Sequence, residues 1–230
     1  MCVADVDDAA GSSVAAAIGG IFVRCDVSDE QQVKQLVERA EERFGPIDLF
    51  CSNAGIGVPD VGGTVSGASN AQWNKIWEIN VMAHIYATRA LLPAMIARGS
   101  GYFLITASAA GLLSQIGSAA YSVTKHAAVG FAESLAITHG EQGIGVSVLC
   151  PQGVWTNMTR GQGDTPQAGD GMLQPEDVAQ FVVEGLAEKR FLILPHPQVL
   201  TYMQRKTGDY DRWIRGMVRL RDQVMSGARG

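Results

Sequence analysis

Short apolar runs alternate with longer amphipathic segments along most of this 230-residue chain. The short runs are continuously apolar, which is typical of strands that helices cover on both faces of a parallel sheet. We expect strands over Cys2–Val6, Ile21–Cys25, Ile47–Ser52, Tyr102–Thr106, Val146–Cys150 and Phe191–Leu194. Strands and helices in this alternation predict an α/β fold with a doubly wound parallel sheet and right-handed crossovers.

The segment between the second and third predicted strands carries helix signals at both ends. Ser28 and Gln31 have the arrangement of a capping box, in which the serine hydroxyl caps the helix and the glutamine side chain reaches back to it. Apolar residues then recur at helical spacing up to Phe44, and Gly45-Pro46 ends the segment. The pattern therefore predicts an amphipathic helix here.

Two segments, Gly55–Asn70 and Thr159–Gly171, have neither pattern and are rich in glycine and polar residues. Long loops of this kind are functional lids or disordered segments. From Thr201 to Arg221, apolar residues recur among many charges, which predicts an amphipathic terminal helix that packs on the domain or on another subunit. We expect a single domain over residues 1–230, with a C-terminal helical extension over about 197–225.

Composition narrows the class of protein. Hydrophobic residues make up 47% of the chain and charged residues 18%, which is typical of a folded globular protein. The formal net charge is −5 and there is no Lys/Arg-rich block, so we expect no nucleic-acid partner. No apolar stretch reaches the ~18–20 residues that span a bilayer, and the acidic N-terminus is unlike a signal peptide. We expect a cytoplasmic protein without a membrane partner.

The cysteines and histidines lack the spacing of metal ligands. The cysteines are Cys2, Cys25, Cys51 and Cys150. They are scattered without a CxxC pair, which favours buried thiols in a reducing compartment. The histidines are His84, His126, His139 and His196. We expect each of them to be a surface or helix residue, so that a metal-dependent hydrolase is a distant alternative and no metal is expected.

A candidate catalytic group lies in the second half of the chain. Tyr121 and Lys125 are four residues apart, so on a helix they share a face and can approach each other. A free phenol has a pKa of about 10, and a nearby ammonium lowers it toward the working range of an acid/base catalyst. Ser108, at the end of the fourth predicted strand, is placed to hold a substrate oxygen beside the phenol. A Tyr and a Lys at this spacing are often a surface pair, so the pair alone does not indicate catalysis.

The accompanying motifs resemble those of the short-chain dehydrogenase/reductase family, in the family's order and over nearly the whole chain. Tyr121 and Lys125 match its YxxxK motif, and Ser108 lies thirteen residues earlier, where the family's catalytic serine is expected. Asn80 matches the asparagine that completes the family's tetrad through a water-bridged proton path to the lysine. The resemblance thus implies a catalytic set of Asn80, Ser108, Tyr121 and Lys125.

Further matches concern the family's cofactor. Asn53-Ala54-Gly55 matches the NAG motif that lines the cofactor cleft, and Asp26-Val27 matches the acidic-apolar pair that contacts the adenine ring. Val154 and Thr156 occupy the positions of a PGxxxT segment that hold the nicotinamide carboxamide, although Gln152 replaces the usual glycine there. Like the catalytic matches, these follow the order of the family's motifs.

The resemblance implies a Rossmann-like fold and an oxidoreductase that transfers hydride between NAD(H) and a secondary alcohol or ketone. In this mechanism Tyr121 exchanges a proton with the substrate oxygen and Ser108 hydrogen-bonds that oxygen. Lys125 lowers the tyrosine pKa and binds the nicotinamide ribose. Tyr121 is also implied to contact the cofactor. The resemblance further implies a homo-oligomer, a tetramer or a dimer.

Asp5 bears on the choice of cofactor. It ends the first predicted strand, where a carboxylate accepts hydrogen bonds from a ribose 2′-hydroxyl and repels a 2′-phosphate. The position therefore favours NAD over NADP. Asp5 is also a candidate cap for the next helix, although Asp7 and Asp8 are better placed for that role.

The family's first strand, TGxxxGxG loop and helix, about 30 residues in a unit of this kind, have no counterpart in the sequence. That loop would supply backbone amides to the pyrophosphate, and strands beside the missing one would lose a hydrogen-bond partner. We expect either a sequence that begins at an internal methionine of an ordinary enzyme, or a shortened product that neither binds dinucleotide nor folds stably. The alternative function is a non-catalytic protein that acts by association or is a truncated gene product.

The side chains expected to shape the substrate pocket are apolar or carry amides, without a cluster of Arg or Lys. A pocket of this kind favours a neutral secondary alcohol or ketone as the substrate. The expected pocket residues are Ala109, Gln115, Gln152, Trp155 and Thr159–Gly171.

Overall fold

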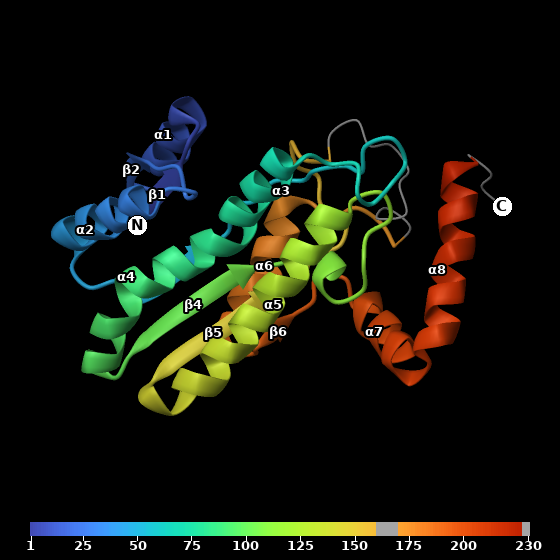
Figure 1. Cartoon of the computed structure of the whole chain (residues 1–230). Coiled ribbons are helices and arrows are strands. Elements are labelled where there is room, and N and C mark those ends of the chain that lie inside the picture. The colour runs from blue at the N-terminus through green and yellow to red at the C-terminus, as the bar shows by residue number, and fades with distance from the viewer. Residues whose placement is uncertain (160–169, 227–230) are drawn as a thin grey trace.

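The computed structural model describes residues 1–159 and 170–226, so most of the predicted loop Thr159–Gly171 lies outside the described residues. Strands and helices alternate along the chain (Figure 1). The strands are β1 (Cys2–Asp5), β2 (Ile21–Arg24), β3 (Leu49–Ser52), β4 (Gly101–Thr106), β5 (Ile144–Leu149) and β6 (Leu192–Ile193). The α-helices are α1 (Asp8–Ala17), α2 (Glu30–Phe44), α3 (Asn70–Trp77), α4 (Ala83–Arg98), α5 (Ala119–His139), α6 (Pro175–Ala187), α7 (Gln198–Gly208) and α8 (Tyr210–Met225). Three shorter helical turns are η1 (Glu78–Met82), η2 (Ala109–Gly111) and η3 (Gly140–Gln142).

The paired strands are parallel, and helices cover both faces of the sheet that contains β4. Phe103 and Ile105 pack into the cluster formed with α4 and α5, whereas Leu104 packs on the other side with α6. Successive strand residues face opposite sides of a sheet, so a continuously apolar strand is covered twice. Figure 1 shows α4 and α5 on one side of β4 and β5 and α6 on the other. The predicted α/β fold is confirmed.

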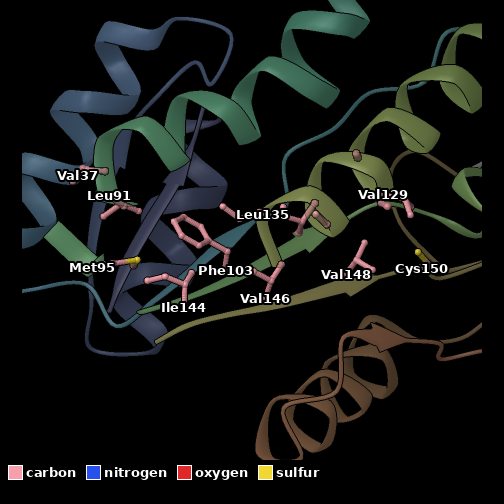
Figure 2. Close-up of a cluster of buried hydrophobic side chains, with 14 residues drawn as sticks. Val37, Leu91, Met95, Phe103, Val129, Leu135, Ile144, Val146, Val148 and Cys150 are labelled. Atoms are coloured by element: carbon pink, nitrogen blue, oxygen red, sulfur yellow. The ribbon is translucent and has the colours of Figure 1, made fainter. Parts of the chain in front are cut away.

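A cluster of buried apolar side chains holds α4 and α5 on the sheet (Figure 2). Phe103 of β4 is 1% exposed and is surrounded by Leu91 and Met95 from α4 and Leu135 from α5. The cluster continues along β5 to Val148 and beyond. It therefore fixes the position of α5 relative to the end of β4, which is where the candidate catalytic residues lie.

The strands form two sheets rather than one continuous doubly wound sheet. One has the order β2-β1, and the other has the order β3-β4-β5-β6. Within residues 1–159 and 170–226 no ladder joins β1 to β3, and Leu49 on β3 is 41% exposed. The two sheets are held together by α2, which packs on α4, and by a buried cluster that contains Val23, Leu36 and Ala87. Both β1 and β3 thus keep one edge without a strand partner.

The cap of α2 differs from the predicted capping box. Asp29 is the cap, and its carboxylate accepts a hydrogen bond from the amide of Gln31 at 2.9 Å. Gln32, not Gln31, reaches back, and its Nε2 donates to Asp29 at 3.0 Å. The Ser28 hydroxyl donates instead to Asp26 at 2.6 Å. A carboxylate is a stronger acceptor than a hydroxyl, which explains why the cap lies one residue later than the sequence predicts.

The C-terminal segment forms two helices where the sequence predicts one. The backbone of Asp209 is extended between α7 and α8, and its side chain accepts a hydrogen bond from the amide of Arg212 at 2.9 Å, which caps α8. Figure 1 shows α8 standing apart from the body, on the side where the loops after β4 and β5 lie. Among the described residues, we find no helix with the length and apolar character that crossing a membrane requires.

Candidate active site

Ser108, Tyr121 and Lys125 line one cleft at the carboxyl ends of the strands. Ser108 follows β4, while Tyr121 and Lys125 are one turn apart on α5, as their spacing predicts. This edge of a parallel sheet is where ligands bind in α/β proteins. The cleft has a volume of about 2620 Å³.

Ser108 is held by the main chain of two neighbouring loops. Its Oγ accepts a hydrogen bond from the amide of Ala110 at 3.1 Å and donates to the carbonyl of Pro151 at 3.4 Å. The Tyr121 phenol lies close enough to the same serine for the Ser108 hydroxyl to lower the pKa of Tyr121. The two hydroxyls therefore lie side by side, in a position to bind one substrate oxygen between them.

Lys125 is fully enclosed beside Tyr121. Its Nζ donates a hydrogen bond to the carbonyl of Thr106 at 2.9 Å and lies 5.6 Å from the centre of the Tyr121 ring. Burial lowers the pKa of Lys125 to about 8. Burial also raises the pKa of Tyr121 above its usual value, and the nearby Ser108 hydroxyl opposes this only in part. Burial thus raises the phenol pKa where sequence analysis expects Lys125 to lower it, and the phenol keeps its proton at neutral pH.

Asn80 is buried in η1, a π-helical turn, and does not itself line the cleft. Its side-chain amide exchanges hydrogen bonds of 2.9 Å with the backbone N–H and C=O of Ile56, and it also donates to Thr124 on α5 at 3.2 Å. A Cβ at Gly55 would come within 3.4 Å of both Asn80 Oδ1 and Lys125 Nζ. Asn80 therefore joins the loop after β3 to α5, close to the lysine, and a glycine at 55 leaves room for both polar groups.

A buried histidine near Lys125 is a feature that sequence analysis missed. His84 on α4 is 1% exposed, and its Nδ1 lies 2.6 Å from the hydroxyl of Ser52 at the end of β3. Burial, and then the positive charge of Lys125, lower the pKa of His84 to about 3, so its ring is neutral. The only signal in the sequence is its position four residues after Asn80, since the contact with Ser52 depends on the tertiary fold.

The residues matched to the family's cofactor motifs border the same cleft. They are Asp5, Asp26, Val27, Asn53, Ala54, Gly55, Val154 and Thr156. They come from the ends of β1, β2, β3 and β5, so the fold gathers positions that are up to 151 residues apart in the sequence. Asn53 also accepts a hydrogen bond from the Thr106 hydroxyl at 2.9 Å, which ties together the loops after β3 and β4.

Asp5 is exposed at the end of β1, and it does not cap α1. That role belongs to Asp7, whose Oδ1 accepts hydrogen bonds from the amides of Ala9 and Ala10 at 3.1 and 3.0 Å. Asp5 Oδ1 accepts one hydrogen bond from the amide of Asp7 at 3.0 Å. The carboxylate therefore faces the cleft from a short turn that fixes its position.

The Gln152 side chain provides a buried acceptor at the cleft. Its Oε1 has no hydrogen-bond partner among the described residues, while its backbone amide donates to His196 Nδ1 at 3.2 Å. A buried acceptor without a partner is costly, so a ligand donor such as a carboxamide NH₂ would satisfy it. His196 is itself 3% exposed and lies between β6 and α7, which corrects the expectation of a surface or helix residue.

Residues 1–167 match the model of the short chain dehydrogenase family. The chain belongs to this family.

Individual relatives agree with the family assignment. The chain is 36% identical to 1-deoxy-11-beta-hydroxypentalenate dehydrogenase from Streptomyces exfoliatus, over 84% of this chain and 70% of the relative. It is 33% identical to 2-(R)-hydroxypropyl-CoM dehydrogenase from Xanthobacter autotrophicus, over 66% of this chain and 60% of that protein. A short-chain dehydrogenase/reductase from Burkholderia phymatum, solved in complex with NAD, superposes with a TM-score of 0.78 at 31% identity. That match covers 91% of this chain and 84% of the solved one.

The residues present fit a nicotinamide dinucleotide. Asp5 offers a carboxylate to a ribose diol, and Gln152 offers an unsatisfied buried acceptor to a carboxamide. Gly55 keeps the backbone after β3 free of a side chain next to Lys125. Asp5, Gly55 and Gln152 all border the one cleft that also contains Tyr121.

The substrate side of the cleft differs from the expected pocket. Ala109, Gln115 and Gln152 line it, but Trp155 does not, because its side chain is 51% exposed and lies outside the lining. Helices α7 and α8 form a further wall, which sequence analysis did not include. This wall contributes Arg205, Arg212 and Arg219 together with several apolar side chains. The sequence led us to expect a pocket without a cluster of Arg or Lys, whereas three arginines line this wall of the cleft.

Proposed function

We propose that the chain carries the catalytic centre of an NAD-dependent oxidoreductase that interconverts a secondary alcohol and a ketone. One observation carries the proposal: Ser108 and Tyr121 line the same cleft, close enough for the serine hydroxyl to lower the pKa of the phenol, with Lys125 enclosed beside them. Two adjacent hydroxyls can bind one carbonyl or alcohol oxygen, and one of them can exchange a proton with it.

Each catalytic residue has a distinct task in this proposal. Ser108 donates a hydrogen bond to the substrate oxygen and fixes it against the phenol. Tyr121 gives its proton to that oxygen when a ketone is reduced and accepts a proton when an alcohol is oxidised. The bound nicotinamide supplies or accepts the hydride. Lys125 places a positive charge beside the phenol and can bind the nicotinamide ribose, and Asn80 holds the loop after β3 against α5.

The direct test is to follow NADH absorbance with a panel of secondary alcohols. We expect NAD to be reduced in a reaction that depends on the alcohol. With the corresponding ketones, we expect NADH to be oxidised. The absence of any change across the panel, with a chain that binds NAD, would contradict it.

Asp5 supports NAD as the cofactor in preference to NADP. A carboxylate at the end of β1 accepts hydrogen bonds from a ribose diol, while it repels a phosphate at the 2′ position. The solved relative from Burkholderia phymatum, at 31% identity, contains NAD. Both observations favour the same cofactor.

We expect Asp5→Asn to reduce the preference for NAD over NADP, measured as the ratio of kcat/KM values, by about tenfold, which corresponds to ~1.4 kcal/mol. The amide oxygen of asparagine still accepts the hydrogen bond from Asp7, so the turn is kept while the charge is lost. Asp8→Asn is the matched control, because Asp8 is an exposed carboxylate that pairs with Arg24 and does not line the cleft. An unchanged ratio in Asp5→Asn would remove Asp5 from cofactor selection.

We expect alcohol oxidation to become faster as the pH rises from about 6 to 7.5, below the pKa of about 8 at which Lys125 loses its charge, because proton acceptance requires the ionised phenol. Burial raises the pKa of Tyr121 above its usual value, so the phenolate is a minor form throughout this range and its fraction grows with each step in pH. Ketone reduction uses the protonated phenol and should not rise over the same range. The measurement is the pH profile of kcat/KM in both directions. An oxidation rate that stays flat would contradict Tyr121 as the base.

A second candidate function, association without catalysis, is favoured by the unpaired edges of β1 and β3. Free strand edges can pair with a strand from another chain. Calorimetric titration with NAD separates the two candidates. Binding at micromolar to millimolar NAD excludes the non-catalytic alternative, whereas no binding in that range favours it.

A further inference from the structure

Helix α7 is fixed to the catalytic loop by a buried lysine. Lys206 is 8% exposed, and its Nζ donates hydrogen bonds to the carbonyls of Leu112 and Leu113 at 2.7 and 2.9 Å. These two residues come directly after η2, the turn that follows Ser108. A second contact joins Tyr202 of α7 to Asp170 at 2.8 Å. Helix α8, which continues from α7, is therefore placed relative to the catalytic residues.

Four apolar side chains of α8 form a stripe that faces the catalytic cleft. The stripe consists of Trp213, Met217, Leu220 and Val224, spaced four, three and four residues apart, which is one face of a helix. All four line the same cleft as Ser108 and Tyr121. In contrast, Ile214 and Val218 lie on the other side of α8 and do not line the cleft.

The stripe is half-buried at Trp213 and Met217 and exposed at its C-terminal end, although its residues are apolar. Leu220 is 37% exposed and Val224 is 38% exposed. Binding is favoured when an apolar ligand removes water from exposed apolar groups on a cleft wall. The same cleft also holds the hydroxyls of Ser108 and Tyr121, so it combines polar groups where the reaction is placed with apolar side chains on the α8 wall.

The size of the cleft also points to a large ligand. Pockets for small molecules usually measure roughly 300–1,000 Å³, whereas this cleft measures about 2620 Å³. A dinucleotide along the ends of β1 to β3 leaves the α8 side of the cleft for the substrate.

We propose that the substrate is an alcohol or ketone with an apolar body of two or more fused rings, which packs against the Trp213–Val224 stripe of α8 while its oxygen lies at Ser108 and Tyr121. This inference rests on the proposed function for the position of the oxygen. The stripe is continuous with the catalytic cleft, which favours a small molecule over a second copy of the chain as its occupant. Arg212 and Arg219 border the stripe on one side, so an acidic group at the edge of the ring system is compatible with the site.

The test measures binding of 2-decalone, a ketone of two fused rings, to the full chain by calorimetry, without turnover. We expect Leu220→Asp to weaken binding by about tenfold or more, because a charge replaces apolar contact area. Val218→Asp is the matched control. Val218 is also an exposed aliphatic residue of α8, at 52%, but it faces away from the cleft, so its variant should bind within about twofold of the original chain.

Several outcomes would overturn the inference. These are no binding of 2-decalone to the original chain, an unchanged affinity in Leu220→Asp, or an equal loss in both variants. If Leu220→Asp instead lowers the mass in sedimentation and leaves the affinity unchanged, the stripe is an interface with a second copy. Because binding is measured without hydride transfer, retained binding with no turnover would contradict the proposed function alone. Turnover of small alcohols without the α8 effect would contradict this inference alone.

Discussion

Tyr121→Phe is expected to lower kcat for alcohol oxidation by about 10²–10⁴-fold, which is the usual contribution of a positioned acid or base. The substitution removes only the hydroxyl, and the ring keeps its packing against α3 and the loop after β3. We therefore expect NAD affinity and thermal stability to stay close to those of the original chain. The measurements are steady-state kinetics in both directions and a titration with NAD. Undiminished turnover would exclude Tyr121 as the proton donor and acceptor.

Tyr102→Phe provides the control for this experiment. Tyr102 is also hydrogen-bonded through its hydroxyl, to Ser147 at 2.8 Å, but it lies on β4 and does not line the cleft. Loss of that hydrogen bond should cost stability of about 0.5–1.5 kcal/mol and leave kcat unchanged. Equal losses of kcat in both variants would show that removing a buried phenol hydroxyl impairs the enzyme through its fold, and not through proton transfer.

The candidate catalytic positions could be proposed from the sequence because they match the family's ordered motifs, and the spacing of Tyr121 and Lys125 depends only on helix geometry. Tyr121 and Lys125 are one helical turn apart, and Ser108 follows a strand whose apolar pattern is plain. Strand positions could also be predicted, since runs such as 102–106 have few alternatives in an α/β chain. The ends of the helices and strands were less well defined by the sequence. The cap of α2, for example, lies at Asp29, because the choice among neighbouring polar residues depends on which acceptor is strongest.

The features that sequence analysis missed all depend on contacts between distant segments. The pairing of His84 with Ser52, 32 residues away, requires α4 to pack behind β3. The division of the strands into two sheets depends on which edges find partners. The orientation of α8 toward the cleft depends on Lys206 and its bonds to Leu112 and Leu113, 94 and 93 residues earlier. A single sequence contains no local signal for such contacts.

Phe103→Ala is expected to lower the free energy of unfolding by about 3–5 kcal/mol, the usual cost of a large cavity in a well-packed core. Phe103 is 1% exposed at the centre of the cluster in Figure 2, where it contacts residues from both α4 and α5. The measurement is urea unfolding followed by circular dichroism. An unchanged denaturation midpoint would mean that the cluster collapses around the smaller side chain, and that it does not fix α5 rigidly on the sheet.

Phe44→Ala separates the loss of core packing from the loss of an aromatic ring in general. Phe44 ends α2, is 45% exposed and has Arg43 5.1 Å above its ring. Its removal should cost less than about 1 kcal/mol, the size of an exposed cation–π contact.

The two variants also differ in their expected effect on catalysis, because the cluster around Phe103 sets the distance between the end of β4 and α5. If that connection holds, Phe103→Ala lowers kcat under conditions where the chain remains folded, since Ser108 and Tyr121 are no longer held together, whereas Phe44→Ala leaves kcat unchanged.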